Sequence, residues 1–252
     1  MNIYYFNEYI AHCQKIELAF SHLHLLQVDT EAIFAAWEEG GLFGFSKDER
    51  GALQSWLNVV AHMSVSAVLG AEISCRLIKE LRNDASSPLY VVHALLVHDW
   101  SKRLDSEYRI KSGADEERVG RFEANNITLL KRSFPDMVVR LAGAAGGSGM
   151  HLAETRGFAL DEKIVFLCDY CTHESSVVSF ERRLKELEPH FKPGGRYAGA
   201  EAYYRQRFGV SHNEKLASIF YPMEKEIGCL LSWSGTPGEL ALSFAPEEFR
   251  GA

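Results

Sequence analysis

Hydrophobic residues recur every three or four positions through most of the chain, and this spacing is typical of helices that bury one face. No segment alternates hydrophobic and polar residues over the length of a strand, and runs of β-branched residues are short. The ranges in which we expect helices are 2–26 (one or two helices), 31–37, 46–81, 89–101, 115–133, 136–145, 161–172, 179–191, 199–208 and 212–231. The pattern predicts an all-α fold.

We expect a single helical-bundle domain with its core in residues 51–192. Residues 1–50 would form an N-terminal helical extension that packs on this core, and residues 193–252 would add C-terminal helices and a packed or frayed tail from Ser232 onward. Ser46 and Glu49 have the spacing of a capping box, which predicts that a helix begins there.

Two polar or glycine-rich segments interrupt the helical pattern. Residues 105–115 are polar, and we expect them to be irregular. Residues 143–149 (GAAGGSG) lack both the preceding strand and the Lys-Ser/Thr pair of a P-loop, so we expect a surface loop there instead of a phosphate-binding loop.

Composition and charge narrow the class of protein. The net charge of −7 over 252 residues argues against an extended nucleic-acid-binding face. We find no apolar run near the ~20 residues that cross a bilayer and no basic segment of a signal peptide at the N-terminus, so we expect a cytoplasmic protein without membrane contact. Five scattered cysteines suit a reducing compartment. Cys168 and Cys171 have the spacing of half a zinc knuckle, but without a second pair we expect two buried residues.

Two acidic residues stand out because they follow strongly hydrophobic runs. The segment VVHALLVHDWSK ends in His98 and Asp99, with Lys102 three positions later, and the segment DEKIVFLCDYCT contains Asp169. A buried carboxylate is costly unless a cation or hydrogen bonds compensate its charge. His98 and Asp99 are adjacent residues of metal-ligand type, so we expect a metal site there.

His62, in the long helical segment, and Asp169 are the candidate partners of His98 and Asp99. Two imidazoles and two carboxylates make a nitrogen and oxygen ligand set that suits Mn²⁺, Mg²⁺, Fe²⁺, Co²⁺ or Ni²⁺, with Zn²⁺ also acceptable. Four protein ligands leave about two octahedral positions for water and a substrate oxygen, as metal-assisted hydrolysis requires.

These residues resemble the signature of the HD-domain metal-dependent phosphohydrolases, in which a His, an adjacent His-Asp and a distant Asp follow in this order. His98 comes 36 positions after His62, and Asp169 comes 70 positions after Asp99. The local segments are also similar: HMSVSA from His62, LVHDWSK around His98, KIVFLCDY before and at Asp169, and VSFERR after it. The resemblance covers about residues 55–190. It implies an HD-type helical bundle and hydrolysis of a phosphomonoester or phosphodiester of a small substrate, with a nucleotide as the leading candidate.

The resemblance is incomplete in ways that affect the expected chemistry. Members with two metals carry further histidines at positions that fall near Phe122 and in the glycine-rich segment of this chain, so we expect one divalent ion per chain. Lys102 stands where some members carry a glutamate, and we expect it to hold a substrate phosphate as a positive charge while Asp99 helps to activate water. Arg182 or its neighbour Arg183 would add a second phosphate contact. The acids that could act around the site are Glu72, Asp105, Glu107 and Glu123.

Two alternatives remain open at this point. One is a di-iron HD-type oxygenase, which would need extra ligands from His93, His151 or His173. The other is a non-catalytic HD module that binds a nucleotide. The sequence is also compatible with a homodimer.

Overall fold

The structure, a computed structural model, describes residues 3–47, 53–81, 87–112, 116–195 and 197–251. Helices account for 74% of it and strands for 4%, which confirms the all-α prediction. In chain order the elements are α1 (Ile3–Leu23), η1 (His24–Leu26), α2 (Thr30–Glu39), β1 (Phe45–Lys47), β2 (Leu53–Ser55), α3 (Leu57–Leu81), α4 (Pro88–Val97), α5 (Lys102–Ser112), α6 (Glu116–Leu129), η2 (Leu130–Arg132), α7 (Asp136–Ala142), α8 (Gly146–Arg156), α9 (Leu160–Tyr170), β3 (Thr172–His173), β4 (Ser176–Val177), α10 (Phe180–Phe191), α11 (Ala198–Phe208), α12 (His212–Leu230), α13 (Leu240–Phe244) and η3 (Glu247–Phe249), where η marks a short 3-10 helix.

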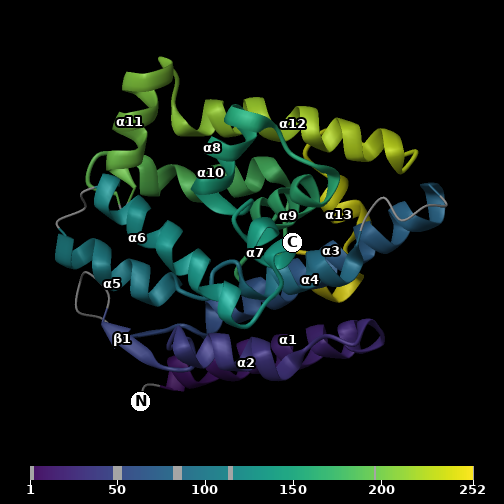
Figure 1. Cartoon of the computed structure of the whole chain (residues 1–252), viewed down its shortest axis with the longest axis horizontal. Coiled ribbons are helices and arrows are strands. Elements are labelled where there is room, and N and C mark those ends of the chain that lie inside the picture. Colours follow the sequence, from purple (N-terminus) through teal and green to yellow (C-terminus); the bar gives the residue numbers. More distant parts are fainter. Residues whose placement is uncertain (1–2, 48–52, 82–86, 113–115, 196, 252) are drawn as a thin grey trace.

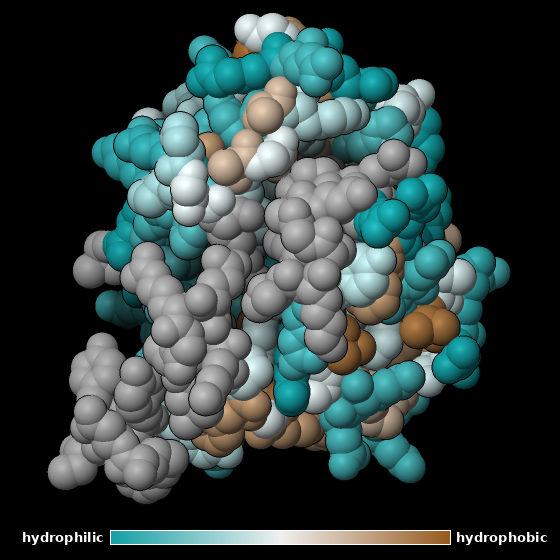
Figure 2. Space-filling model, turned by 90° about the vertical axis from the view of Figure 1, so that its left-hand side faces the viewer, coloured by the Kyte–Doolittle hydropathy of each residue, from teal (hydrophilic) through white to brown (hydrophobic). Residues whose placement is uncertain are grey.

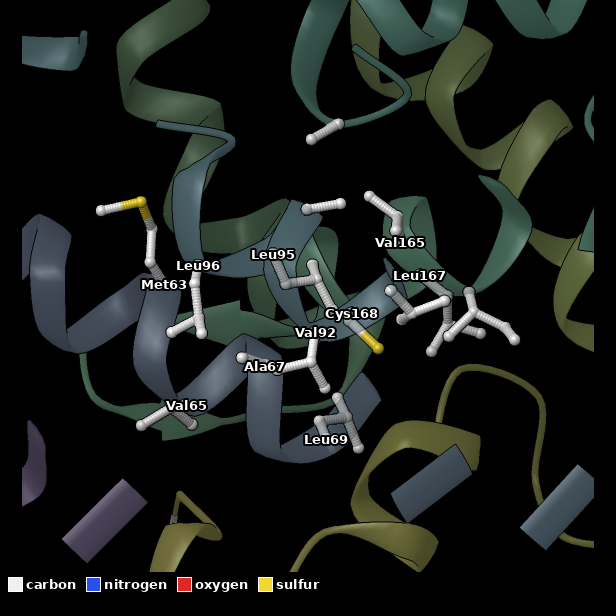
Figure 3. Packing of buried hydrophobic residues seen from close by; sticks show 14 of the residues in the cluster. Met63, Val65, Ala67, Leu69, Val92, Leu95, Leu96, Val165, Leu167 and Cys168 are labelled. Carbon is white, nitrogen blue, oxygen red and sulfur yellow. The ribbon is translucent and has the colours of Figure 1, made fainter. Parts of the chain in front are cut away.

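Helix α3 is the centre of the bundle and packs against α1, α4 and α9 (Figure 1). Side chains of these helices, including Leu69, Leu95 and Cys168, point toward one another in the core (Figure 3). Gly70 permits the close approach of α3 and α4, because a Cβ at this position would lie 2.4 Å from Leu95 Cδ1. The close packing of these helices fixes the positions of the polar residues that they carry.

The two ends of the chain cover this central group. Helices α1 and α2 lie along one side of α3 and α4, and α12 lies on the opposite side of the molecule in Figure 1. The tail is packed, because Leu240 and Phe249 are fully buried. The Glu224 carboxylate holds the tail by accepting hydrogen bonds from the backbone N–H groups of Gly238 (2.6 Å) and Leu240 (3.0 Å).

The capping box expected at Ser46 is absent. Residues Phe45–Lys47 form β1, which pairs with β2 in an antiparallel hairpin, and α3 begins only at Leu57. The Ser46 hydroxyl instead accepts a hydrogen bond from Trp56 Nε1 at 2.9 Å. Glu49 lies outside the described residues. The short hairpin therefore replaces the first turns of the helix that the periodicity predicted.

The polar segment expected to be irregular is a helix over most of its length. Residues Lys102–Ser112 form α5, which pairs with α6. Asn126 of α6 donates to Asp105 Oδ1 at 2.7 Å, and the rings of Tyr108 and Phe122 stack with centroids 4.2 Å apart. The side of the molecule that faces the viewer in Figure 2 is mostly hydrophilic among its coloured residues. The side chains of residues 102–108 are only partly buried, so a polar composition here is compatible with a helix and was misleading.

The glycine-rich segment is also different from the expected surface loop. Gly146 is the first residue of α8, while Ala144, Ala145 and Gly149 are buried. A Cβ at Gly149 would lie 1.9 Å from the carbonyl oxygen of Ala144, so only glycine fits this contact. The small residues therefore allow α8 to begin inside the protein.

The expectation that no apolar run has the length of a membrane span was wrong for α3. This helix has 25 residues and a window with a mean hydropathy of 1.3, so by length and composition it could cross a membrane. However, 83% of that window is buried inside the protein. Its apolar character is that of the central helix of the bundle.

Candidate metal centre

The end of α4 places His98 and Asp99. Pro88 opens this helix at a position where its missing N–H costs nothing. The indole N–H of Trp37, on α2, donates to the carbonyl oxygen of Leu96 at 2.7 Å, which satisfies one of the free carbonyls at the helix end. His98 then donates from Nδ1 to the carbonyl oxygen of Leu95 at 2.9 Å. This bond fixes the ring and leaves Nε2 as the atom available to a ligand.

Three helical regions that are distant in sequence bring their candidate ligands together. Asp169 Oδ1, near the end of α9, lies 3.0 Å from His62 Nε2 on α3 and 3.2 Å from His98 Nε2. Asp99 Oδ2 lies 3.9 Å from His98 Nε2. His62, His98 and Asp99 each offer one ligand atom, and these atoms lie within 4.8 Å of one another. The four residues singled out in the sequence thus form one cluster.

The sequence missed a backbone contribution to this cluster. The N–H of Gly146, the first residue of α8, donates to Asp169 Oδ2 at 2.8 Å. The positive end of the helix dipole therefore faces the carboxylate. Gly146 has a φ of 61°, and a Cβ there would meet nothing within 4 Å, so there is open space beside this contact. The glycine-rich run was the available signal for this role.

Electrostatics favour positive charge between the carboxylates. Burial lowers the pKa of His62 and outweighs the opposing effect of Asp169. At His98 burial also lowers the pKa, but Asp169 and Asp99 together raise it to about 9. Burial raises the pKa of Asp169, yet His98 and His62 hold it well below its usual range. An ionised carboxylate thus lies between two imidazoles, in a place where a cation is stabilised.

The geometry fits a bound ion. Two ligands at right angles on an ion with bonds of about 2.1 Å lie about 3 Å apart. The separations of 3.0 and 3.2 Å between Asp169 Oδ1 and the two imidazole nitrogens match this spacing, and without an ion the 3.0 Å contact with His62 is a hydrogen bond. His98 Nε2 is sealed from solvent and lacks an aligned hydrogen bond despite its nearness to Asp169. A buried nitrogen without a hydrogen-bond partner is the atom that a metal ion would satisfy.

Lys102 lies at the edge of this cluster. Its Nζ is 3.2 Å from Asp99 Oδ1, and 37% of its side chain remains exposed. Asp99 raises the pKa of Lys102, with smaller contributions from Tyr197, Asp169 and Glu123. Lys102 therefore stays protonated and can act as a positive charge but not as a base. Its side chain can reach both Asp99 and a ligand in solvent.

The candidate acids around the site differ in their surroundings. Glu72 is exposed, and Glu107 forms an ion pair with Arg103 at 3.0 Å. Asp105 accepts hydrogen bonds from Ser101 (2.8 Å) and Asn126 (2.7 Å), and burial raises its pKa. Glu123 acts electrostatically on Lys102. Of the four candidate acids, Asp105 and Glu123 are therefore the two that lie near the cluster.

The histidines that a second ion would need lie in other environments. His93 donates from Nδ1 to the carbonyl oxygen of Leu89 at 2.8 Å and accepts at Nε2 from the N–H of Asp29 at 3.1 Å. His173 lies 2.9 Å from Glu186, and His151 is exposed. Within the described ranges, none of the three belongs to the group that could hold an ion.

The two neighbouring arginines of α10 have different environments. Arg182 Nε donates to Glu186 Oε1 at 3.0 Å, and 45% of its side chain is exposed. Arg183 is half-buried and acts electrostatically on Tyr170, the residue next to Asp169. Arg182 is therefore held in an ion pair on α10, and a phosphate contact by Arg182 or Arg183 stays a prediction.

The remaining sequence candidates are structural. Cys168 and Cys171 are fully buried, as expected, and burial raises the pKa of both thiols well above its usual range. No family model, curated protein or solved structure matches this chain. A proposal for the function therefore rests on the geometry of the cluster.

Proposed function

We propose that this protein is a mononuclear metal-dependent phosphohydrolase of the HD type that acts on a small phosphorylated substrate, with a nucleotide as the leading candidate. The observation that supports this most is the convergence of His62, His98, Asp99 and Asp169, in which Asp169 Oδ1 lies within 3.2 Å of both imidazole nitrogens. Together with the order of these residues in the sequence, this cluster resembles the HD-type site.

The residues of the site would have distinct roles. His62, His98, Asp99 and Asp169 would hold a divalent ion, which when bound supplies a water of lowered pKa and polarises a phosphoryl oxygen. Lys102, permanently charged beside Asp99, would bind a non-bridging phosphate oxygen and so orient the ester. Asp169 would be kept in position by the Gly146 N–H on its second oxygen.

The first test is metal content followed by a hydrolysis assay. The purified protein should contain about one divalent ion per chain, and after loading with Mn²⁺, Co²⁺ or Ni²⁺ it should release phosphate from at least one member of a panel of phosphoesters. Asp99→Ala should abolish this release. Asp136→Ala is the matched control, because the Asp136 side chain is 86% exposed and its one ion pair among the described residues is with Lys131.

The outcomes separate the alternatives. A protein that binds nucleotides equally well with and without Asp99→Ala, and hydrolyses none of them, would be a non-catalytic module. Two irons per chain would indicate the oxygenase. Absence of phosphate release from the whole panel by the metal-loaded protein would contradict the proposal.

A further inference from the structure

A cavity of about 360 Å³ lies on α5 and α6, the two packed helices that follow His98 and Asp99 in the chain (Figure 1). Pockets that bind small molecules have about 300–1,000 Å³, so this volume suits a small ligand. None of the lining residues belongs to the candidate metal centre. Among the described residues, the lining consists of Tyr108 from α5 and Arg118, Arg121, Phe122 and Asn125 from α6.

Helix α6 presents its four lining residues on one face, because positions three or four apart are neighbours on a helix surface. A stripe with this spacing normally consists of apolar residues that the helix buries against a core. Here Phe122 is the apolar member and is partly buried, whereas Arg118, Arg121 and Asn125 are exposed. Packing against the core therefore does not account for this face, and a ligand that contacts both an aromatic ring and charged groups would.

Tyr108 and Phe122 give the cavity a flat apolar surface. Their rings are stacked, with centroids 4.2 Å apart and an angle of 6° between the planes, and both residues are only partly buried. One turn away, the hydrogen bond from Asn126 to Asp105 (2.7 Å) joins the same two helices and so helps to fix the positions of the rings. Accessible aromatic side chains are surfaces on which the planar ring of a ligand can stack.

Arg118 and Arg121 make the cavity positive in a chain whose net charge is −7. A guanidinium is permanently charged and offers five N–H donors in a planar fork, which suits a carboxylate or a phosphate. Both arginines also interact within the chain, but five donors allow more than one acceptor. The cavity thus combines an aromatic surface with an anion-binding pair.

The cavity is separate from the metal-type cluster. Lys102, which contacts Asp99 at 3.2 Å, is the first residue of α5, and Tyr108 comes six positions later. With a rise of about 1.5 Å per residue, the two are about 9 Å apart along the helix. A ligand held by the five lining residues would therefore lie outside the metal-type cluster.

We propose that this cavity is a nucleotide-binding site, in which the base stacks on the Tyr108–Phe122 pair and a phosphate is bound by Arg118 and Arg121. The amide of Asn125 has donor and acceptor atoms that can pair with the edge of a base. A nucleoside would use only the aromatic surface, and inorganic phosphate would use only the arginines, so a nucleotide is the ligand that uses both. The site goes beyond the proposed function, because it binds its ligand without a metal and without hydrolysis.

The test is isothermal titration calorimetry of the chelator-treated protein with three probes, AMP, adenosine and inorganic phosphate. AMP should bind at least about tenfold more tightly than either of the other two, because stacking and charged hydrogen bonds then act together. Absence of saturable AMP binding, or AMP that binds no more tightly than adenosine or phosphate, would overturn the site.

Single substitutions should separate the two halves of the site. Phe122→Leu removes the ring but keeps apolar bulk, so it should weaken AMP and adenosine about fivefold and leave phosphate within about twofold. Arg121→Met should weaken AMP and phosphate about tenfold and leave adenosine within about twofold. A structural role alone would weaken all three probes together, and that result in the folded variants would contradict the assignment.

The matched controls are Tyr90→Leu and Arg132→Met. Tyr90 lies on α4 and is 38% exposed, and Arg132 is exposed in η2, directly after α6. Both variants should bind AMP within about twofold of the unmodified protein, and losses equal to those at Phe122 and Arg121 would overturn the site. Circular dichroism shows whether each variant is folded, and if Phe122→Leu is not, Arg121→Met, at an exposed position, carries the test.

Further results separate this site from the metal centre. Lys102→Ala should leave the AMP affinity of the metal-free protein within about twofold, and a loss as large as that in Arg121→Met would place the nucleotide at the metal-type cluster and overturn the cavity site. If the metal-loaded protein hydrolyses no phosphoester, yet AMP binding depends on Phe122 and Arg121, the proposed function fails and the nucleotide site stands. If it hydrolyses phosphoesters and binds AMP independently of Phe122 and Arg121, the nucleotide site fails and the proposed function stands.

Discussion

Helix α9 carries two acids with little exposure, the buried Glu162 near its start and Asp169 (14% exposed side chain) near its end, and their partners differ in kind. Arg156 donates to both oxygens of Glu162, at 2.6 and 3.1 Å, and the N–H of Ala159 adds a third bond at 2.9 Å. Asp169 is held by two imidazoles and one backbone N–H, and one of these imidazoles has a nitrogen without an aligned hydrogen bond.

The comparison separates a structural acid from a candidate functional one. At Glu162 each carboxylate oxygen accepts a hydrogen bond from Arg156, so the charge is compensated and the helix start is fixed. At Asp169 the partners are themselves metal-ligand types, and their hydrogen-bonding capacity is not exhausted. Burial of a carboxylate alone is thus weak evidence for a functional site. Partners that keep an atom free to bind a further ligand are stronger evidence.

The largest expected effect is loss of metal affinity in Asp169→Asn. Partners that only orient a ligand change affinity by about 10–100-fold, so removal of a charged ligand should cost at least about 100-fold. Equilibrium dialysis followed by elemental analysis measures this loss. Glu162→Gln should leave metal affinity unchanged, and a similar loss in both variants would erase the distinction between the two acids.

Glu162→Gln should instead lower the free energy of unfolding. Breaking a buried ion pair costs about 3–5 kcal/mol, and because 41% of the Arg156 side chain is exposed we expect about 2 kcal/mol at pH 7. Urea denaturation measures this difference. A change below about 0.5 kcal/mol would mean that the ion pair has no structural role.

The same pair predicts a pH dependence of stability. Burial raises the pKa of Glu162, but Arg156 and the Ala159 N–H outweigh this effect and lower it overall. The stabilisation is therefore present above the unfolded-state pKa of about 4.3 and is lost as the pH falls through the lower pKa of the folded state. The stability difference between the unmodified protein and Glu162→Gln should shrink below about pH 4.3. A difference that grows with acidity would refute this assignment.

The smallest expected effect comes from glycine-to-alanine substitutions at the two ends of α8. Gly146 and Gly157 have φ values of 61° and 70°, and a Cβ at either would meet nothing within 4 Å. Alanine at each should cost about 1 kcal/mol of stability, because L-residues disfavour this conformation. Only Gly146→Ala should also weaken metal binding, since only its N–H contacts Asp169. Equal metal affinity in the two variants would show that this contact is dispensable.

The parts of the site that the sequence predicted are those that side-chain type and spacing encode. His98 and Asp169 were conspicuous because charged or metal-ligating groups follow apolar runs, and such groups need compensation inside a core. The role of Gly146 was missed because it depends on a backbone N–H, and small residues do not reveal where a buried helix begins.

Two other details show where the sequence is ambiguous in a physical sense. Arg182 and Glu186 have the i, i+4 spacing of a helical ion pair, but whether Arg182 or Arg183 contacts a phosphate stays a prediction. Helix α5 was missed because its apolar positions are few, and a partly buried helix held by a polar contact between Asp105 and Asn126 has weak periodicity. The all-α class needed neither detail, since it follows from helical spacing along the rest of the chain.

The hydrogen bond from Trp37 to the carbonyl of Leu96 makes the N-terminal helices part of the site's support. Gly40, at the end of α2, packs closely against the turn that follows α4, because a Cβ at Gly40 would lie 1.9 Å from the carbonyl oxygen of Trp100. A fragment trimmed to begin at residue 51 would expose the end of α4 to water and free the turn that carries His98 and Asp99. The smallest unit worth expressing for metal or substrate studies therefore starts at α1, although every ligand lies after it.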